Sequence, residues 1–354
     1  MSNRRDFLKS VSGAAAGMFL SFQAAPPKRR EVSIGRRRIK VVDIHGHFIA
    51  PEELELIKDT NLAGNIRNNL NGPLVLGPAR LRYMDEHGID IQALSHQGGW
   101  WYGLERDMAR RLIDVQNDRL AAWCLAHPDR FVGLASVALQ HPDLAAEQLD
   151  HAVKKLGLRG VGIAGHAGGE VPFAPKYDPF WAKAQELGVL VFVHPGGADN
   201  VLREGALRGR GDLGNIIGNP LETTVFLSRM IFEGTLDRFP SLKLCGAHAG
   251  GYLPSYLGRT DVACDVRDNA NCANKKHPRE YFKQQILVDS VIISEEGLRH
   301  LVAEVGANQI VYGTDIPFNW PTAVDLILQA SFLKDAEKEA ILGGNLIKLL
   351  RIGS

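Results

Sequence analysis

Several features are scarce in this chain of 354 residues, and each scarcity argues against a class of protein. There are four cysteines and no C-x-x-C spacing, so the cysteines do not form a metal site. The formal net charge is +1, which leaves no overall field to attract nucleic acid. The apolar run near the N-terminus is too short to span a membrane. No G-x-G-x-x-G follows a strand-like run near the start, which weakens the case for a dinucleotide fold.

The first residues have the layout of a bacterial secretion signal. The stretch NRRDFLKS contains Arg4 and Arg5, and a weakly apolar, Ala-rich run follows it. We therefore expect residues 1–25 to be a twin-arginine signal peptide that directs the protein to the periplasm. A frayed basic tail before a chance Ala-rich helix is the alternative. Residues 26–40 are basic and are expected to be a linker, with one short strand at 31–34.

Export also bears on the cysteines. Cys264 and Cys272 lie in a polar segment, and an exported protein could join them in a disulfide. Cys124 and Cys245 lie inside apolar runs and are expected to be small core residues.

Eight short apolar runs alternate with helical patterns between residues 41 and 354. The runs are nearly continuous and rich in Val, Ile and Leu, as expected for strands buried on both faces. They cover residues 41–45, 90–95, 131–137, 160–165, 189–194, 242–248, 285–290 and 309–315. This alternation predicts one α/β domain with the architecture of a (β/α)8 TIM barrel, and a doubly wound open sheet is the alternative. Residues 51–77 are expected to form a small insert over the barrel mouth.

Histidines gather where the predicted strands end. Five of the twelve histidines and one aspartate lie at or just past C-terminal strand ends, which face the mouth of such a barrel. They are His45, His47, His166, His194, His248 and Asp315. His45 and His47 stand two positions apart in VVDIHGHF, so the period of a strand directs both imidazoles to one face.

Imidazole nitrogens and one carboxylate are a usual ligand set for a divalent ion. We expect His45, His47, His194 and Asp315 to bind one such ion, Zn²⁺ first and Mn²⁺ or Fe²⁺ as alternatives. Each ligand also has a purely structural alternative. The first two histidines could cap a loop, His194 could be a core histidine before a tight turn, and Asp315 could cap the last helix.

Other residues near the predicted mouth are candidates for catalysis and substrate binding. His248 is the candidate general acid/base, because a neutral imidazole transfers protons near neutral pH, and Asp315 is a second candidate acid. A fifth metal ligand or a structural residue is the alternative for His248. His166 could orient substrate or simply line its loop. Trp100 could form an apolar wall for a planar substrate, or it could pack the insert onto the barrel together with Trp101.

Four motifs in chain order resemble the amidohydrolase superfamily: D-I-H-G-H, V-H-P, A-H-x-G-G and G-T-D-x-P. The closer resemblance is to its decarboxylase branch, typified by aminocarboxymuconate semialdehyde decarboxylase and gamma-resorcylate decarboxylase. The run NPLETTVFLSRMIFEGTLDRFPSLKLCGAHAGGYLPSYLGR and the run RYMDEHGIDIQALS are very similar to that branch. The resemblance covers residues 41–350. One H-x-H is a weak signal, whereas four motifs in order at barrel positions form a strong one.

The resemblance implies roles for the same residues and adds two arginines. It implies the ligand set above, with His248 beside the metal as the group that handles the proton. It also implies that Arg259, eleven residues past His248, reaches the site of a neighbouring subunit in a homodimer. Arg67 lies near the position of a second family arginine, with its spacing displaced by about one residue. No lysine on the fourth strand could bridge two metals, so the resemblance implies a mononuclear site.

These residues predict a reaction as well as a fold. We expect a metal-dependent, non-oxidative decarboxylase that acts on a small aromatic or muconate-type carboxylic acid. A metal-dependent hydrolase of a lactone, an amide or a carbon–carbon bond is the alternative, because the same fold and ligands serve both. A periplasmic metal- or ligand-binding protein without turnover is a third hypothesis.

Overall fold

The computed structural model describes residues 29–353 except residues 61 and 97–99. The predicted signal peptide, residues 1–25, lies outside the described residues. Among the residues that the structure describes, no helix is both long and apolar enough to cross a membrane.

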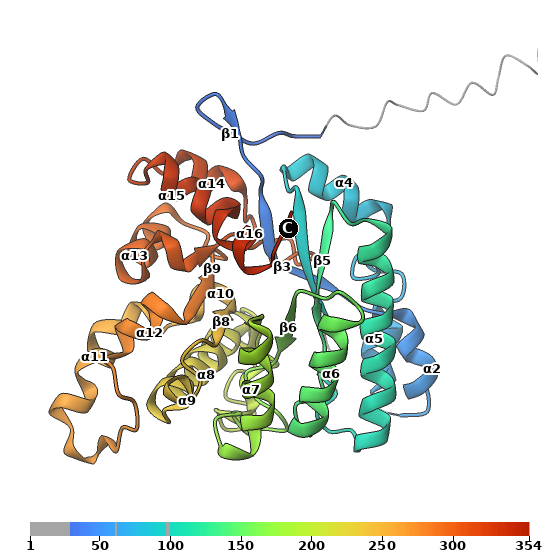
Figure 1. Cartoon of the computed structure of the whole chain (residues 1–354), viewed down its shortest axis with the longest axis horizontal. Coiled ribbons are helices and arrows are strands. Elements are labelled where there is room, and N and C mark those ends of the chain that lie inside the picture. Colours follow the sequence, from blue (N-terminus) through green and yellow to red (C-terminus); the bar gives the residue numbers. More distant parts are fainter. Residues whose placement is uncertain (1–28, 61, 97–99, 354) are drawn as a thin grey trace, which may run out of the picture.

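Eight parallel strands form one sheet in chain order, and helices surround it (Figure 1). The strands are β3 (Val42–Phe48), β4 (Ile91–His96), β5 (Phe131–Ala135), β6 (Gly160–Ile163), β7 (Leu190–Val193), β8 (Lys243–Gly246), β9 (Ile286–Asp289) and β10 (Ile310–Val311). Every predicted strand is present, although most are shorter than expected. The prediction of a (β/α)8 barrel is confirmed.

Contacts between β3 and the segment after β10 close the ring. The amide of Ile44 donates to the carbonyl of Tyr312 at 2.9 Å, and the amide of His47 donates to that of Ile316 at 3.0 Å. Gly46 and Ile316 form an isolated parallel bridge. Because β10 itself is only two residues long, this seam has few ladder hydrogen bonds.

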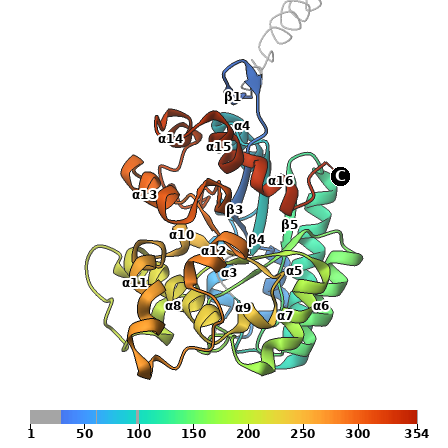
Figure 2. The same ribbon diagram turned by 60° about the vertical axis from the view of Figure 1, so that its left-hand side comes forward.

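Helices and short helical turns occupy the connections between strands, as Figure 2 shows from a second direction. The helices are α2 (Leu54–Ile57), α3 (Ala63–Asn69), α4 (Pro78–His87), α5 (Arg106–Ala126), α6 (Pro142–Lys154), α7 (Asp178–Leu187), α8 (Asn219–Phe232), α9 (Thr235–Arg238), α10 (Ala247–Gly250), α11 (Leu257–Val266), α12 (Pro278–Gln284), α13 (Glu295–Val305), α14 (Val324–Gln329), α15 (Asp335–Glu339) and α16 (Asn345–Leu349).

Local sequence explains how these helices begin and which face they bury. In α13 the hydroxyl of Ser294 accepts a hydrogen bond from the amide of Gly297, which satisfies one of the free donors at the helix start. Leu298, Leu301 and Val305 follow at spacings of three and four, so they share one face, and all three are buried. The main apolar core lies between such helix faces and the sheet.

The insert after β3 has a small apolar cluster of its own, which includes Ile57, Ile66 and Trp101. The carboxylate of Glu53 fastens its first turn to the barrel. It accepts hydrogen bonds from His96 Nε2 at 2.6 Å and from Gln116 Nε2 at 2.8 Å. The neighbours of Trp101 thus favour the packing role that the sequence left open for it.

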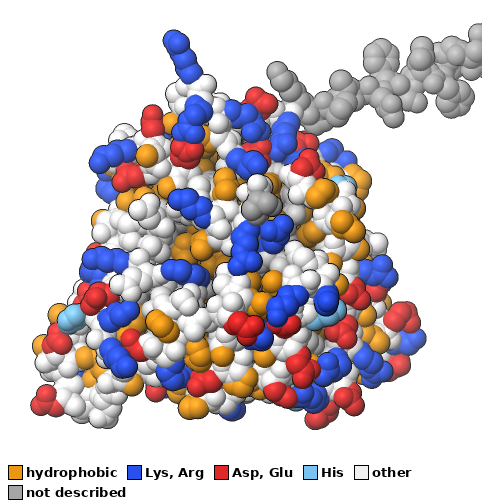
Figure 3. Space-filling view, viewed as in Figure 1, with side chains coloured by type: hydrophobic (Ala, Val, Ile, Leu, Met, Phe, Trp, Pro, Cys, Tyr) orange, Lys and Arg blue, Asp and Glu red, His pale blue; other side chains and the backbone are white. Residues whose placement is uncertain are grey.

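The described part of the predicted linker packs against the barrel. It forms a hairpin of β1 (Ser33–Ile34) and β2 (Arg37–Arg38), which lies above β3 in the view of Figure 1. Arg30 pairs with Asp325 through two hydrogen bonds, of 2.5 and 3.0 Å, and the flanking Val32 and Ile39 are buried. Figure 3 shows acidic and basic side chains interspersed on this face, in keeping with the small net charge.

The cysteines follow the expectations from sequence. Cys264 and Cys272 form a disulfide that joins α11 to the segment after it. Cys245 is buried, and Cys124 is half-buried.

Candidate metal centre

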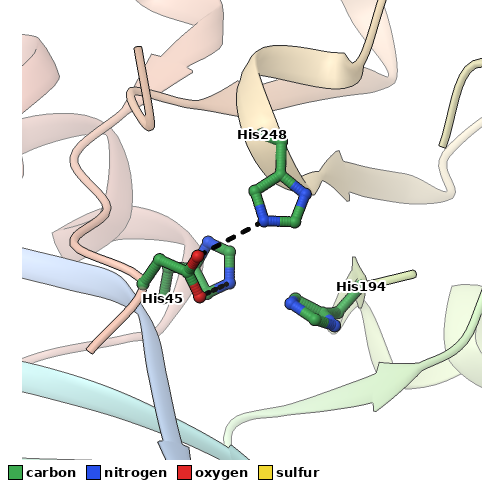
Figure 4. A group of neighbouring side chains, drawn as sticks. His45, His194 and His248 are labelled. Carbon is green, nitrogen blue, oxygen red and sulfur yellow. Dashed lines mark ion pairs between the residues drawn. The ribbon is translucent and has the colours of Figure 1, made fainter. Parts of the chain in front are cut away.

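Five of the predicted site residues meet at the C-terminal end of the barrel. Oδ1 of Asp315 lies 3.2 Å from Nε2 of His45 and 3.1 Å from Nε2 of His47. The ring centroid of His194 lies 5.0 and 4.6 Å from the centroids of the same two imidazoles. Oδ2 of Asp315 faces Nε2 of His248 at 3.5 Å. Figure 4 shows the rings of His45, His194 and His248 turned toward one another.

A β-bulge contributes to this convergence. The register between β3 and β4 shifts between Asp43 and Gly46, so β3 has one more residue there than its neighbour. Such an insertion re-aims the side chains beside it. The period of a strand predicted only that both imidazoles lie on one face. The observed strand pairing adds a β-bulge at His45.

Hydrogen bonds select the tautomer of two of the histidines. Nδ1 of His45 lies 2.6 Å from Oδ2 of Asp289, and Nδ1 of His194 lies 3.0 Å from the carbonyl oxygen of Pro195. Because each acceptor takes an N–H, the lone pair of each neutral ring is on Nε2. Nε2 of His45 is buried and makes no hydrogen bond of good geometry within the described residues.

Burial and neighbouring charges shift the pKa values of the cluster in different directions. Burial lowers the pKa of His47 to about 4, helped by the charges of His45 and His248, and burial also lowers the pKa of His194 well below its ordinary value. Burial opposes protonation of His45 as well, but Asp315 and Asp289 outweigh it and raise that pKa to about 10. The pKa of Asp315 is depressed, because the surrounding imidazoles outweigh its own burial.

These observations identify a site for a divalent ion. Ligand atoms of three imidazoles and one carboxylate, from His45, His194, His248 and Asp315, lie within 4.8 Å of one another, and Nε2 of His45 is buried without a hydrogen bond of good geometry. Imidazole nitrogens and a carboxylate oxygen are suitable ligands for a divalent ion such as Zn²⁺. Three of the predicted ligands, His45, His194 and Asp315, belong to this group, and His248 is its fourth member. His47 contacts the group through Asp315, so the ligand set that includes His47 stays a prediction.

Backbone conformation is unusual at two of these residues. His248 and Asp315 have φ values of 53° and 58°, in the left-handed region that residues with a side chain seldom adopt. Asp289 holds the first of these turns, because its carboxylate accepts hydrogen bonds from the amides of His248 at 3.1 Å and Ala249 at 2.8 Å. The catalytic candidate is therefore oriented by a buried acid.

Two aromatic side chains lie beside the cluster. The ring of Phe318 is 5.6 Å from that of His47, and it is among the most exposed large apolar side chains. Trp100 packs near Gly162 of β6 and Gly196 after β7, and it stacks on Tyr102 with a centroid distance of 6.3 Å.

The remaining predicted residues have different surroundings. His166 accepts a hydrogen bond from the amide of Gly169 at 3.1 Å, and its Nε2 lies 3.8 Å from Glu222. Arg67 is exposed on α3 and donates to the carbonyl of Lys58 at 2.6 Å. Arg259 is exposed on α11, and it is not a member of the metal cluster that the described residues form. The substrate roles of these residues stay predictions.

Sequence reasoning missed two residues of the site. Asp289 ends a predicted strand, so an acid at the end of an otherwise apolar run was the available signal. Phe318 lies three residues after Asp315, directly after the motif G-T-D-x-P. Its role depends on the turn after β10, which no local pattern predicts.

Comparisons with known proteins agree with this geometry. Residues 42–352 match the model of the amidohydrolase family. The chain is 32% identical to the 2-amino-3-carboxymuconate-6-semialdehyde decarboxylase of Dictyostelium discoideum, over 77% of this chain and 75% of that protein. It is 31% identical to the gamma-resorcylate decarboxylase of Rhodococcus jostii, over 78% and 88%.

A solved structure supports the same assignment. The dihydroxybenzoic acid decarboxylase of Polaromonas, with bound manganese and the inhibitor 2-nitroresorcinol, superposes with a TM-score of 0.78 and 26% identity. The match covers 89% of this chain and 98% of that one. The predicted resemblance is confirmed: this chain belongs to the amidohydrolase family and, within it, to the branch of metal-dependent decarboxylases.

Proposed function

We propose that this protein is a metal-dependent, non-oxidative decarboxylase of a small aromatic or muconate-type carboxylic acid. The observation that carries the proposal is the arrangement around Asp315. One carboxylate oxygen faces His45 and His47, and the other faces His248, so a metal site and a proton donor lie side by side. The two decarboxylase relatives named above support the reaction class.

His45, His47, His194 and Asp315 would hold one ion, which would bind the substrate carboxylate with an adjacent oxygen and act as a Lewis acid. Three imidazoles favour Zn²⁺ over Mn²⁺, since imidazole nitrogen suits zinc and Mn²⁺ prefers oxygen ligands. The Polaromonas enzyme was crystallised with manganese. Metal analysis of the purified protein, followed by reconstitution with each ion, decides between the two.

The residues of the chain then manage charge and protons. Loss of CO₂ leaves an electron pair on a ring or chain carbon, and that carbon needs a proton. His248 Nε2 lies 3.5 Å from Asp315 Oδ2, so a proton on this imidazole is held beside the carboxylate, from where it could be transferred to the substrate carbon. Trp100 and Phe318 would confine the flat substrate, which limits the geometries from which the carboxylate departs.

A second copy of the chain would complete the substrate site. Helix α11 buries only Leu257, and the exposed apolar side chains Tyr256, Val262 and Val266 lie on or just before it. Exposed apolar side chains that form one patch mark association surfaces, and Val262 and Val266, four residues apart on the helix, share one face. We propose a homodimer in which Arg259 binds the substrate carboxylate in the neighbouring site, where a guanidinium can make two parallel hydrogen bonds.

The test is turnover of a panel of hydroxybenzoates and muconate semialdehydes by the metal-loaded protein in D₂O. We expect release of CO₂, and deuterium on the carbon that lost it. Incorporation of ¹⁸O from labelled water into the product would instead favour the hydrolase. Absence of both signals from every acid in the panel, with one ion bound per chain, would overturn the proposal.

We further propose export to the periplasm by the twin-arginine route. The Arg4-Arg5 pair and the Ala-rich run after it support this location, as does a disulfide, which persists in oxidising compartments. Replacement of both arginines by lysine should retain the full-length protein in the cytoplasmic fraction. Periplasmic recovery of that variant would contradict the route.

A further inference from the structure

A buried carboxylate lies behind the metal ligands and takes no part in the chemistry described above. Asp43 is fully buried and accepts four hydrogen bonds. Oδ1 accepts from the amide of His45 at 2.9 Å and from the amide of Thr314 at 3.0 Å. Oδ2 accepts from the hydroxyl of Thr314 and from Nε2 of Gln92, both at 2.7 Å. Four donors around one buried carboxylate leave few of its lone pairs unsatisfied.

These bonds join the two chain segments that carry the metal ligands. His45 belongs to β3, and Thr314 directly precedes Asp315 in the segment after β10. The two segments meet at the barrel seam, where the ladder is short because β10 has only two residues. Asp43 therefore adds cross-links at the weakest point of the ring, next to the ligands on either side.

The network continues to the second ligand through a buried arginine. Nη1 of Arg80 donates to Oε1 of Gln92 at 2.9 Å, and its Nη2 donates to the carbonyl of His47 at 2.8 Å. Arg80 comes from α4, and only 4% of its surface is exposed. The backbones of both histidine ligands of β3 are thus held by one set of side chains that originates on β3, on β4 and on a helix outside the barrel.

The same network accounts for the glycine between the two histidines. A Cβ atom added to Gly46 would lie 2.5 Å from Cδ of Gln92. Any larger residue would push away the amide that bonds Asp43. The glycine of H-G-H is therefore required by its contact with Gln92, in addition to any requirement of the proposed metal site.

We infer that Asp43 is a positioning residue for the metal centre, which sets the distance between the imidazoles of β3 and the carboxylate of Asp315. This inference rests on the metal site of the proposed function. Ligands whose supporting groups are already ordered bind an ion without the free-energy cost of arranging them, and such support is commonly worth a large factor in affinity.

The test replaces Asp43 by Asn, which keeps the shape and removes one acceptor oxygen. An amide placed there must present its NH₂ to donors on one side or the other, so at least one cross-link is lost. We expect the affinity for Zn²⁺, measured by competition with a chromophoric chelator, to fall by about 10- to 100-fold. We also expect the visible absorption of the Co²⁺-loaded variant to change, because that spectrum reports ligand geometry.

Asp90→Asn is the matched control. Asp90 is also buried, and it accepts a backbone hydrogen bond from Val41 at 2.7 Å together with hydrogen bonds from two arginines. It lies at the opposite end of the barrel from the ligands, at the start of β4. The same substitution there should lower stability without changing the Zn²⁺ affinity or the Co²⁺ spectrum.

A second pair of variants keeps the test open if D43N does not fold. Thr314→Val removes only the hydroxyl bond, and Thr314→Ser keeps it, so the valine variant should lose affinity by a few-fold and the serine variant should retain it. Wild-type affinity and an unchanged spectrum in folded D43N would overturn the inference, as would an equal loss in D90N. Neither the Zn²⁺ affinity nor the Co²⁺ spectrum depends on turnover. A protein that binds zinc but decarboxylates none of the acids would therefore contradict the proposed function without contradicting the role of Asp43.

Discussion

All four predicted metal ligands are buried, whereas on α11 only Leu257 is buried and Arg259 projects from the exposed side. In Figures 1 and 2 this helix lies at the margin of the molecule. The metal cluster is cross-linked through Asp43, Asp289 and Asp315, with each carboxylate bonded to several partners.

The middle of α11 is fastened by an ion pair between Asp261 and Arg279, and its last turn by the disulfide. All residues of the metal cluster come from one chain. The role proposed for Arg259, by contrast, requires a second copy of the chain.

We expect the largest effect from replacing Asp315, a buried residue of the metal cluster. Asp315→Asn removes a ligand and the partner of His248 in one change, so kcat/KM should fall by about 10³-fold or more. Activity assays and metal analysis of the same preparation check both losses. Asp90→Asn is the control for replacing a buried carboxylate elsewhere in the barrel. Activity within tenfold of the wild type would show that the cluster is not the catalytic centre.

Replacing His248 tests whether this residue donates a proton or binds the ion. His248→Gln should lower kcat by roughly 10²-fold, because the proton donor is lost, while one ion per chain is retained. The measurement is kcat together with the metal content. A variant that loses its ion as well would make this histidine a fifth ligand, the alternative left open by the sequence.

The contrast also shows what sequence could and could not predict. His45, His47, His194 and His248 were found because each follows an apolar strand, and barrel topology brings strand ends together. The partners behind them depend on pairing across long separations, which local patterns do not contain. Asp43 bonds Thr314 across 271 residues of chain, and His45 bonds Asp289 across 244.

Adjacent residues were equally hard to separate from sequence alone. Trp100 and Trp101 are neighbours, but the second has a φ of 52° and turns into the insert cluster. A left-handed residue breaks the alternation on which strand and loop predictions depend. The last strand shows the same limit, because Asp315 has a positive φ inside the range 309–315 that was predicted to be extended.

Variants of Arg259 test the proposed role of α11 separately from that of the metal cluster. Arg259→Ala should raise KM by roughly ten- to a hundredfold, the value of a lost charged hydrogen bond. Arg267→Ala, at the exposed end of the same helix, is the matched control.

Mixing R259A with D315N under subunit exchange should restore about a quarter of the sites, since a two-fold dimer then pairs one intact pocket with one intact arginine. A mixture no more active than its components would contradict the shared site.

The smallest expected effect concerns the covalent link on α11. Replacing Cys264 and Cys272 by serine should lower the free energy of unfolding by about 2 kcal/mol, because the short loop between them gains freedom in the unfolded chain. Urea unfolding measures this change, and sedimentation equilibrium should show weaker dimerisation, since the C-terminal half of α11 carries exposed Val262 and Val266. Zn²⁺ affinity should stay that of the wild type. A loss of zinc binding in this variant would mean that the two halves are coupled through the fold, rather than through the shared substrate alone.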